Sequence, residues 1–172
     1  MKTALQEKMV RAGRLVVMVV AMACALTTTL AEAQFGGPAK EVNFSAVILP
    51  ATDKLPARLA ITATIDDGWH IYSITQAKGG PRPTKFSFDA SGDFEIAGDF
   101  TPDKPPKVHV YQDIWPDLNV EEHHGTVVWT APLKFAAGVN PAGVEITGSV
   151  KGQVCNDEQC NNFKKAISAE TE

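Results

Sequence analysis

Hydrophobic and polar residues alternate with a period of two along much of the chain after residue 40. In segment 59–65, Leu, Ile, Ala and Ile at every second position are separated by Ala and Thr, which indicates a half-buried β-strand. No stretch of ten or more residues after residue 33 shows a convincing helical period of 3.6. We expect further strands over residues 42–49, 69–74, 85–88, 94–97, 108–111, 119–122, 126–135, 144–150 and 163–167.

Turn-forming residues lie between these expected strands. The segments Asp66-Asp67-Gly68 and Ser91-Gly92-Asp93 are turn signals. Pro132 lies inside segment 126–135 and suggests an edge strand or a bulge, because proline has no backbone N–H to donate. Short strands separated by frequent turns indicate an all-β fold, and we predict an immunoglobulin-like antiparallel β-sandwich.

The first 33 residues have the order of a secretory signal peptide. Four basic residues between Lys2 and Arg14 precede an apolar stretch, Leu15 to Leu30, and Ala31-Glu32-Ala33 matches a cleavage site. The apolar stretch is short for a membrane span, although an uncleaved anchor and a lipoprotein modified at Cys24 are alternatives. We expect residues 1–33 to be a cleaved signal peptide and residues 34–172 to form one exported, periplasmic domain.

If residues 1–33 are removed on export, the charge that bears on function is that of the remaining chain. Residues 34–172 contain 12 Lys and Arg against 18 Asp and Glu, a net charge of −6. This mild acidic excess argues against binding to nucleic acid or to anionic membrane surfaces. An oxidising compartment would also allow a pair of cysteines to persist as a disulfide.

Cys155 and Cys160 are the two cysteines outside the N-terminal apolar segment, and four polar residues separate them. A four-residue polar loop between strands is an ordinary hairpin connection. The cysteines would then face each other with Cα atoms about 4.5–5.5 Å apart, which permits a disulfide. A bond closing so short a loop contributes only about 2 kcal/mol, against about 4–5 kcal/mol for one linking distant strands. The spacing alone leaves a structural and a redox role open.

Histidines raise a third interpretation, a metal site, with His70, His109, His123 and His124 as available ligands. His123 and His124 are adjacent in a segment, Glu121–Gly125, that we expect to be an exposed hairpin tip. Adjacent strand residues point to opposite faces, so they chelate poorly, and we predict no metal site. We expect the paired acids in this tip to be solvated.

Motifs of other enzyme classes are missing from the sequence. It contains no G-x-S-x-G, no phosphate-binding loop and no H-E-x-x-H, so nothing indicates a hydrolase or a transferase. We predict no small-molecule cofactor.

Two short motifs, Asp67-Gly68-Trp69-His70-Ile71-Tyr72 and Gly152-Gln153-Val154-Cys155 with the following Cys160, resemble a known family. It is the N-terminal periplasmic domain of the thiol–disulfide interchange protein DsbD, or disulfide bond corrector domain. The resemblance covers about Val42 to Ala169. It implies an immunoglobulin-like sandwich that acts as a protein-disulfide reductase or interchange component. Such a domain accepts electrons from a thioredoxin-like or membrane-embedded donor and reduces oxidised periplasmic proteins.

The resemblance also assigns roles to residues. It implies that Cys155 and Cys160 are the redox pair, with Cys160 facing the partner and Cys155 resolving the mixed disulfide. It implies a cap loop with an apolar tip that covers the sulfurs until a partner docks. The remaining site residues that it implies are Asp113, Ile114 and Trp115 in the cap loop, with Ile114 over the disulfide, and His70 and Tyr72 lining the site.

The chain departs from the familiar family pattern at several positions. Four residues rather than five separate the cysteines, Ile114 replaces a phenylalanine at the cap tip, and His70 replaces an aromatic residue. Asn161-Asn162 stands where Pro-Pro commonly follows the second cysteine. The chain stops at Glu172, without the family's membrane and thioredoxin-like domains, so we expect a separate electron donor. A non-catalytic immunoglobulin-like binding module with a structural disulfide is the alternative.

Overall fold

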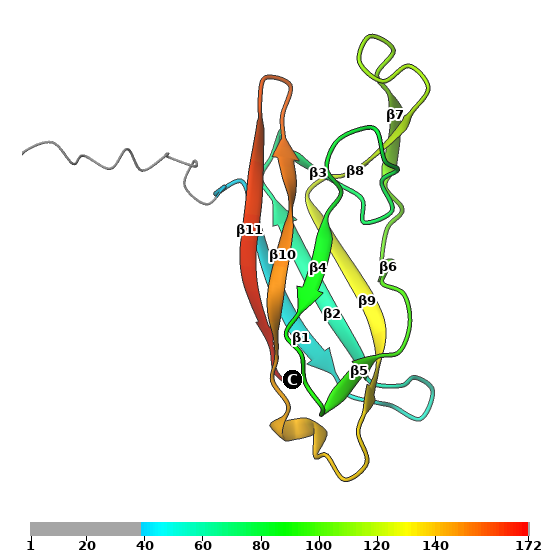
Figure 1. Ribbon diagram of the computed structural model, residues 1–172, viewed down its shortest axis with the longest axis vertical. Helices are drawn as coiled ribbons and strands as arrows, with labels where there is room; N and C mark the ends of the chain where they lie inside the picture. Colours follow the sequence, from blue (N-terminus) through cyan, green and yellow to red (C-terminus); the bar gives the residue numbers. More distant parts are fainter. Residues whose placement is uncertain (1–38, 172) are drawn as a thin grey trace, which may run out of the picture. The chain divides into compact units, whose positions relative to one another are not determined.

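The computed structural model describes residues 39–171, and the expected signal peptide lies outside the described residues. Within that range the chain forms eleven strands and one short 3-10 helix, arranged as two antiparallel sheets (Figure 1). This is the predicted all-β, immunoglobulin-like sandwich. No helix in residues 39–171 has the length and apolar character needed to cross a membrane.

The first sheet has the order β1-β2-β9-β5, with the short strand β6 also paired to β9. Alternating apolar residues give β2 one buried face, and the ladder with β1 runs from Val42 opposite Ile65 to Leu49 opposite Arg58. The bounds are β1 Val42–Leu49, β2 Arg58–Ile65, β5 Phe94–Ile96, β6 Thr101–Pro102 and β9 Thr126–Phe135.

The second sheet has the order β11-β10-β3-β8-β7, and β4 pairs with β10 as well. Strands β3 and β4 share one edge of β10, because β3 pairs with Val154 and Cys155 and β4 pairs with residues 148–151. The bounds are β3 His70–Tyr72, β4 Lys85–Phe88, β7 Lys107–Val110, β8 Asn119–His123, β10 Ile146–Cys155 and β11 Cys160–Ala169, with the 3-10 helix η1 at Pro141–Gly143.

Pro132 is not at the edge of the sheet. It lies opposite Arg58 in the β2–β9 ladder. On the other side of β9, the paired strand changes from β6, opposite Thr130, to β5, opposite Leu133. Pro132 therefore lies between two short ladders, where its missing N–H removes no ladder hydrogen bond on that side.

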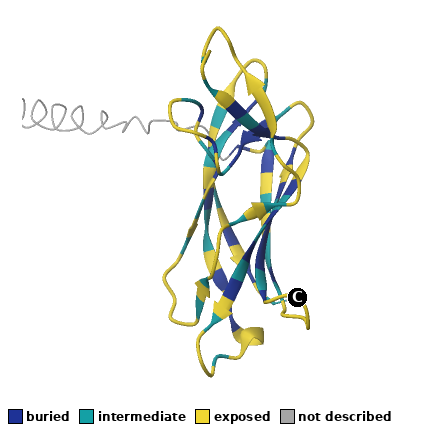
Figure 2. Cartoon of the chain, turned by 90° about the vertical axis from the view of Figure 1, so that its right-hand side faces the viewer, coloured by how far each residue is buried: buried dark blue, intermediate teal, exposed yellow. Residues whose placement is uncertain are grey.

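The core lies between the two sheets and is centred on Trp129, which is fully buried. The Trp129 ring lies 5.5 Å from that of Phe86 and 5.2 Å from that of His123, so β9 of one sheet contacts β4 and β8 of the other. Phe44 of β1 and Phe163 of β11 meet at 5.3 Å. Buried and exposed residues alternate along the long strands (Figure 2), as expected for sheets with one core-facing side.

Candidate functional site

Cys155 and Cys160 form a disulfide at the end of the β10–β11 hairpin. They are the last pair in the ladder, with Cα atoms 4.1 Å apart, which confirms the facing pair that the hairpin pattern predicted. The Asn156 side chain closes the loop, because its Oδ1 accepts hydrogen bonds from the backbone N–H groups of Glu158 and Gln159. The sequence thus folds the loop by itself and holds the two cysteines opposite each other.

The two cysteines differ sharply in burial. Cys155 is 1% exposed and packs in a small apolar cluster with Tyr72 and Val120. Trp115 and Leu118 pack against the same cluster. Cys160 is exposed. Solvent therefore contacts the residue Cys160 and is almost excluded from Cys155.

The disulfide lies on the side of the second sheet that faces away from the core, which we call the outer face. Residues paired across a ladder point to the same side, and neighbours along a strand point to opposite sides. Val154, Ile71 and His123 belong to the core side, where His123 packs against Trp129. The register therefore assigns to the outer face Cys160, Cys155, His70, Tyr72, Glu122, Val120 and His109.

His70 is the direct ladder partner of Cys155. Its Nε2 atom lies 3.3 Å from the Tyr72 hydroxyl and 3.6 Å from Oε1 of Glu122. Burial lowers the pKa of His70, although the Glu122 carboxylate opposes this effect. Burial, together with Glu122, raises the pKa of Tyr72 to about 12. At neutral pH both side chains are therefore neutral, and His70 offers no positive charge to stabilise a thiolate.

The segment between β7 and β8 corresponds to the expected cap loop. Backbone hydrogen bonds from Ile114 and Trp115 to the carbonyl of Tyr111 fold it into a compact turn. Trp115 packs against the cluster that contains Cys155, whereas Ile114 is 64% exposed and Asp113 is also exposed. In this structure the apolar cover beside the disulfide thus comes from Trp115, and the Ile114 side chain points into solvent.

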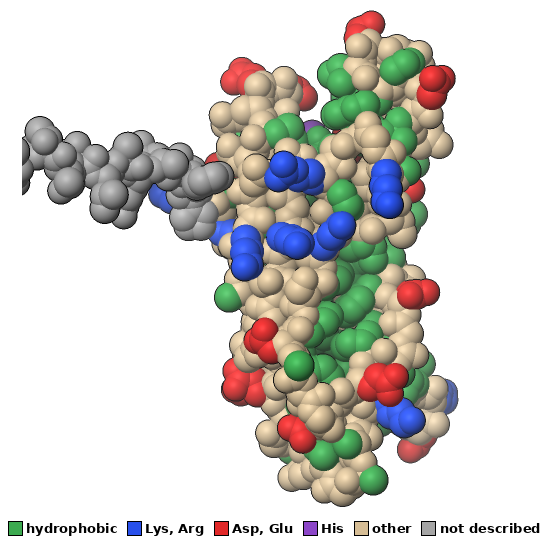
Figure 3. All heavy atoms as spheres, in the orientation of Figure 1, with side chains coloured by type: hydrophobic (Ala, Val, Ile, Leu, Met, Phe, Trp, Pro, Cys, Tyr) green, Lys and Arg blue, Asp and Glu red, His purple; other side chains and the backbone are tan. Residues whose placement is uncertain are grey.

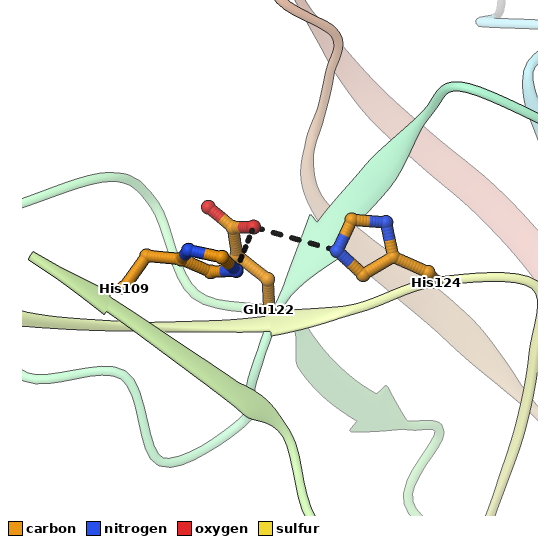
Figure 4. Close-up of side chains that lie close together, drawn as sticks. All are labelled: His109, Glu122 and His124. Carbon is orange, nitrogen blue, oxygen red and sulfur yellow. Dashed lines mark ion pairs between the residues drawn. The ribbon is translucent and has the colours of Figure 1, made fainter. Parts of the chain in front are cut away.

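Glu122 is a site residue that the sequence pattern did not indicate. We expected Glu121 and Glu122 to be solvated, but Glu122 lies in β8 and its side chain is only 3% exposed. The Tyr111 hydroxyl donates a hydrogen bond of 2.7 Å to Oε1 of Glu122. Nε2 of His124 lies 3.4 Å and Nε2 of His109 lies 3.7 Å from Oε2 of the same carboxylate (Figure 4).

His123 and His124 do point to opposite sides, as the strand geometry predicts. His123 is buried against Trp129, and the ring of His124 lies 5.4 Å from that of His70. The cluster around Glu122 nevertheless forms because His109 comes from a neighbouring strand. That neighbour relation follows from the β7–β8 register, which local sequence does not reveal.

Fold and site together define an immunoglobulin-like domain with a disulfide in which Cys160 is exposed and Cys155 is buried. Neither a family model nor a curated protein matches the sequence. Among solved structures, the chain is similar to the N-terminal periplasmic domain of ScsB from Proteus mirabilis, with a TM-score of 0.50 and 12% identity. The match covers 77% of this chain and 47% of that chain, so it spans about half of the longer structure. At this identity the likeness shows the fold alone.

Proposed function

We propose that this domain is an exported redox carrier that exchanges electrons through the Cys155–Cys160 disulfide. The observation that carries the proposal is the unequal exposure of the pair, with Cys160 open to solvent and Cys155 buried. Disulfide exchange needs one sulfur that meets the partner and a second that resolves the mixed disulfide. A purely structural bond has no need for this division.

The exchange proceeds in two balanced steps. In the reduced domain, the Cys160 thiolate attacks a disulfide of the client, forms a mixed disulfide and releases one client thiolate, which takes up a proton. The Cys155 thiolate then attacks the Cys160 sulfur, forms the intramolecular disulfide and releases the second client thiol. Two electrons pass to the client. A dithiol donor reverses both steps and regenerates the reduced pair.

An apolar surface suited to docking lies at the same end of the domain as the disulfide. The structure has five exposed large hydrophobic residues within residues 39–171, and four of them fall in segment 108–114. This segment and the disulfide hairpin project at the same end of the domain (Figure 1), and hydrophobic side chains lie on the projecting loop together with acidic ones (Figure 3). Exposed apolar patches of this kind commonly mark protein-binding sites. The partners we propose are a thioredoxin-like or membrane-embedded donor and oxidised periplasmic proteins.

The reduction potential tests this proposal against a structural disulfide. We expect a midpoint between roughly −120 and −270 mV, the range of exchange-active pairs, whereas structural disulfides usually lie below about −300 mV. The measurement equilibrates the oxidised domain in graded dithiol buffers and counts free thiols by alkylation and mass spectrometry. A midpoint well below −300 mV would favour the binding-module alternative.

Export is a separate part of the proposal. The order of basic, apolar and small residues in segment 1–33 favours cleavage after Ala33, and both the resembled family and the ScsB domain are described as periplasmic. We expect protein isolated from the cell envelope to begin at Gln34. Intact-mass analysis checks this, and a full-length mass would indicate an uncleaved anchor.

A further inference from the structure

We propose that His109, Glu122 and His124 bind a divalent transition-metal ion such as Zn²⁺ on the outer face of the second sheet. One ligand atom from each of these residues lies within 4.8 Å of the other two. Two imidazoles and a carboxylate are ligands that Zn²⁺ prefers, and a set of three protein ligands leaves a fourth position for water.

The distances suit an ion better than direct hydrogen bonds. Nε2 of His124 and Nε2 of His109 approach Oε2 of Glu122 at 3.4 and 3.7 Å. Both distances exceed the roughly 2.7–3.2 Å of an N–H···O hydrogen bond. Bonds of about 2.0–2.1 Å at a tetrahedral angle separate two zinc ligands by about 3.3 Å. The two separations from Glu122 are therefore close to those that a shared ion requires, and the nitrogens of the two histidines lie within 4.8 Å of each other.

The carboxylate at the centre of the cluster is buried, while the two histidines are partly exposed to solvent. Glu122 is 3% exposed, and a buried carboxylate needs a compensating positive charge. Among residues 39–171, the basic side chains within 4.0 Å of it are imidazoles. His109 and His124 have side chains 50% and 37% exposed. Packing therefore confines these two rings less than it confines the carboxylate.

A second set of contacts orients the carboxylate. The Tyr111 hydroxyl donates to Oε1 of Glu122 at 2.7 Å, and His70 lies 3.6 Å from the same oxygen. These contacts leave Oε2 directed at the two histidines (Figure 4). Hydrogen bonds to the outer oxygen of a ligating carboxylate are a regular feature of protein metal sites. Tyr111 thus acts as a positioning residue.

The test is isothermal titration of the oxidised full-length mature protein, without a histidine tag, with Zn²⁺. In the closed disulfide neither cysteine is available as a thiolate ligand for Zn²⁺, so the result is independent of the redox proposal. We expect one Zn²⁺ per chain. His109→Ala and His124→Ala, both at exposed positions, should each weaken binding by more than the roughly 10- to 100-fold expected for Tyr111→Phe, which removes a positioning contact.

Two control variants make the result specific. Val108→Ala changes an exposed neighbour on β7, and Glu121→Gln removes an adjacent carboxylate that points away from Glu122. Both should bind Zn²⁺ as the wild type does. The proposal is overturned if the wild type binds no Zn²⁺, or if His109→Ala and His124→Ala bind it as tightly as the wild type. Equal weakening by Glu121→Gln and by the histidine variants would also overturn it, since it would indicate general surface charge.

Discussion

The Cys155→Ser variant should form a stable mixed disulfide with a single-cysteine thioredoxin-like protein, and the Cys160→Ser variant should form little. The thiol left in the first variant, Cys160, is exposed, whereas Cys155 is 1% exposed and enclosed by Tyr72, Val120 and Trp115. Access and thiolate character govern attack on a disulfide, so we expect trapping rates to differ on the order of tenfold or more. Non-reducing gels and intact mass measure the product.

A control in the denatured protein distinguishes the effect of burial from the intrinsic reactivity of each thiol. In urea, both variants should react with an alkylating reagent at similar rates, because neither thiol is then covered. If the folded Cys160→Ser variant traps the partner and Cys155→Ser does not, the assignment of the two sulfurs is reversed. If neither traps it, thiol–disulfide exchange is excluded as the function.

Replacing Trp115 by Ala should speed reduction of the disulfide by a small dithiol. When a thiolate attacks Cys160, the departing sulfur is that of Cys155, and an apolar environment raises the pKa of a thiol and slows its departure. Removing the indole admits water to the cluster. A more acidic thiol leaves faster, and we expect reduction to be faster on the order of threefold to tenfold. Stopped-flow kinetics of reduction measures the rate.

Ile114→Ala provides the matched comparison for this variant. Ile114 belongs to the same turn but is 64% exposed, so its removal should leave reduction by the small dithiol unchanged. Loss of Ile114 should instead slow exchange with a protein partner, since its exposed side chain belongs to the proposed docking surface. Faster small-dithiol reduction in Ile114→Ala than in Trp115→Ala would show that Ile114 shields the sulfurs in solution.

Local sequence predicts much of the fold, because alternating apolar residues and turn residues mark most of the strands. The strands at 42–49, 85–88 and 126–135 were predicted with the bounds that β1, β4 and β9 have. The predicted segment 144–150 begins two residues before β10 and ends five residues short of its end, and the predicted segment 163–167 is shorter than β11 at both ends. Segment 151–154, Lys-Gly-Gln-Val, is mostly polar, contains a glycine and does not show the pattern of a strand. Pairing with β11 on one side and with β4 and β3 on the other extends it to Cys155.

The candidate site also has one part that local sequence predicts and another part that it does not. The facing cysteines follow from a hairpin and a short loop, and both are visible in the sequence. The cluster at Glu122 depends on three strands meeting in one register, with Tyr72 and Lys107 on either side of Glu122. No local pattern specifies that register. The exposure of Ile114 and the partial burial of Trp115 depend likewise on how the turn packs against β8.

Because the disulfide lies on the outer face, its redox state should have little effect on the stability of the sandwich. The bond closes a short loop, and the core around Trp129 lies on the other side of the sheet. Opening it removes about 2 kcal/mol of chain-entropy stabilisation and breaks no contact between the two sheets. Under the proposed redox function, we therefore expect the sandwich to stay folded in both the oxidised and the reduced state, with the change confined to the disulfide hairpin.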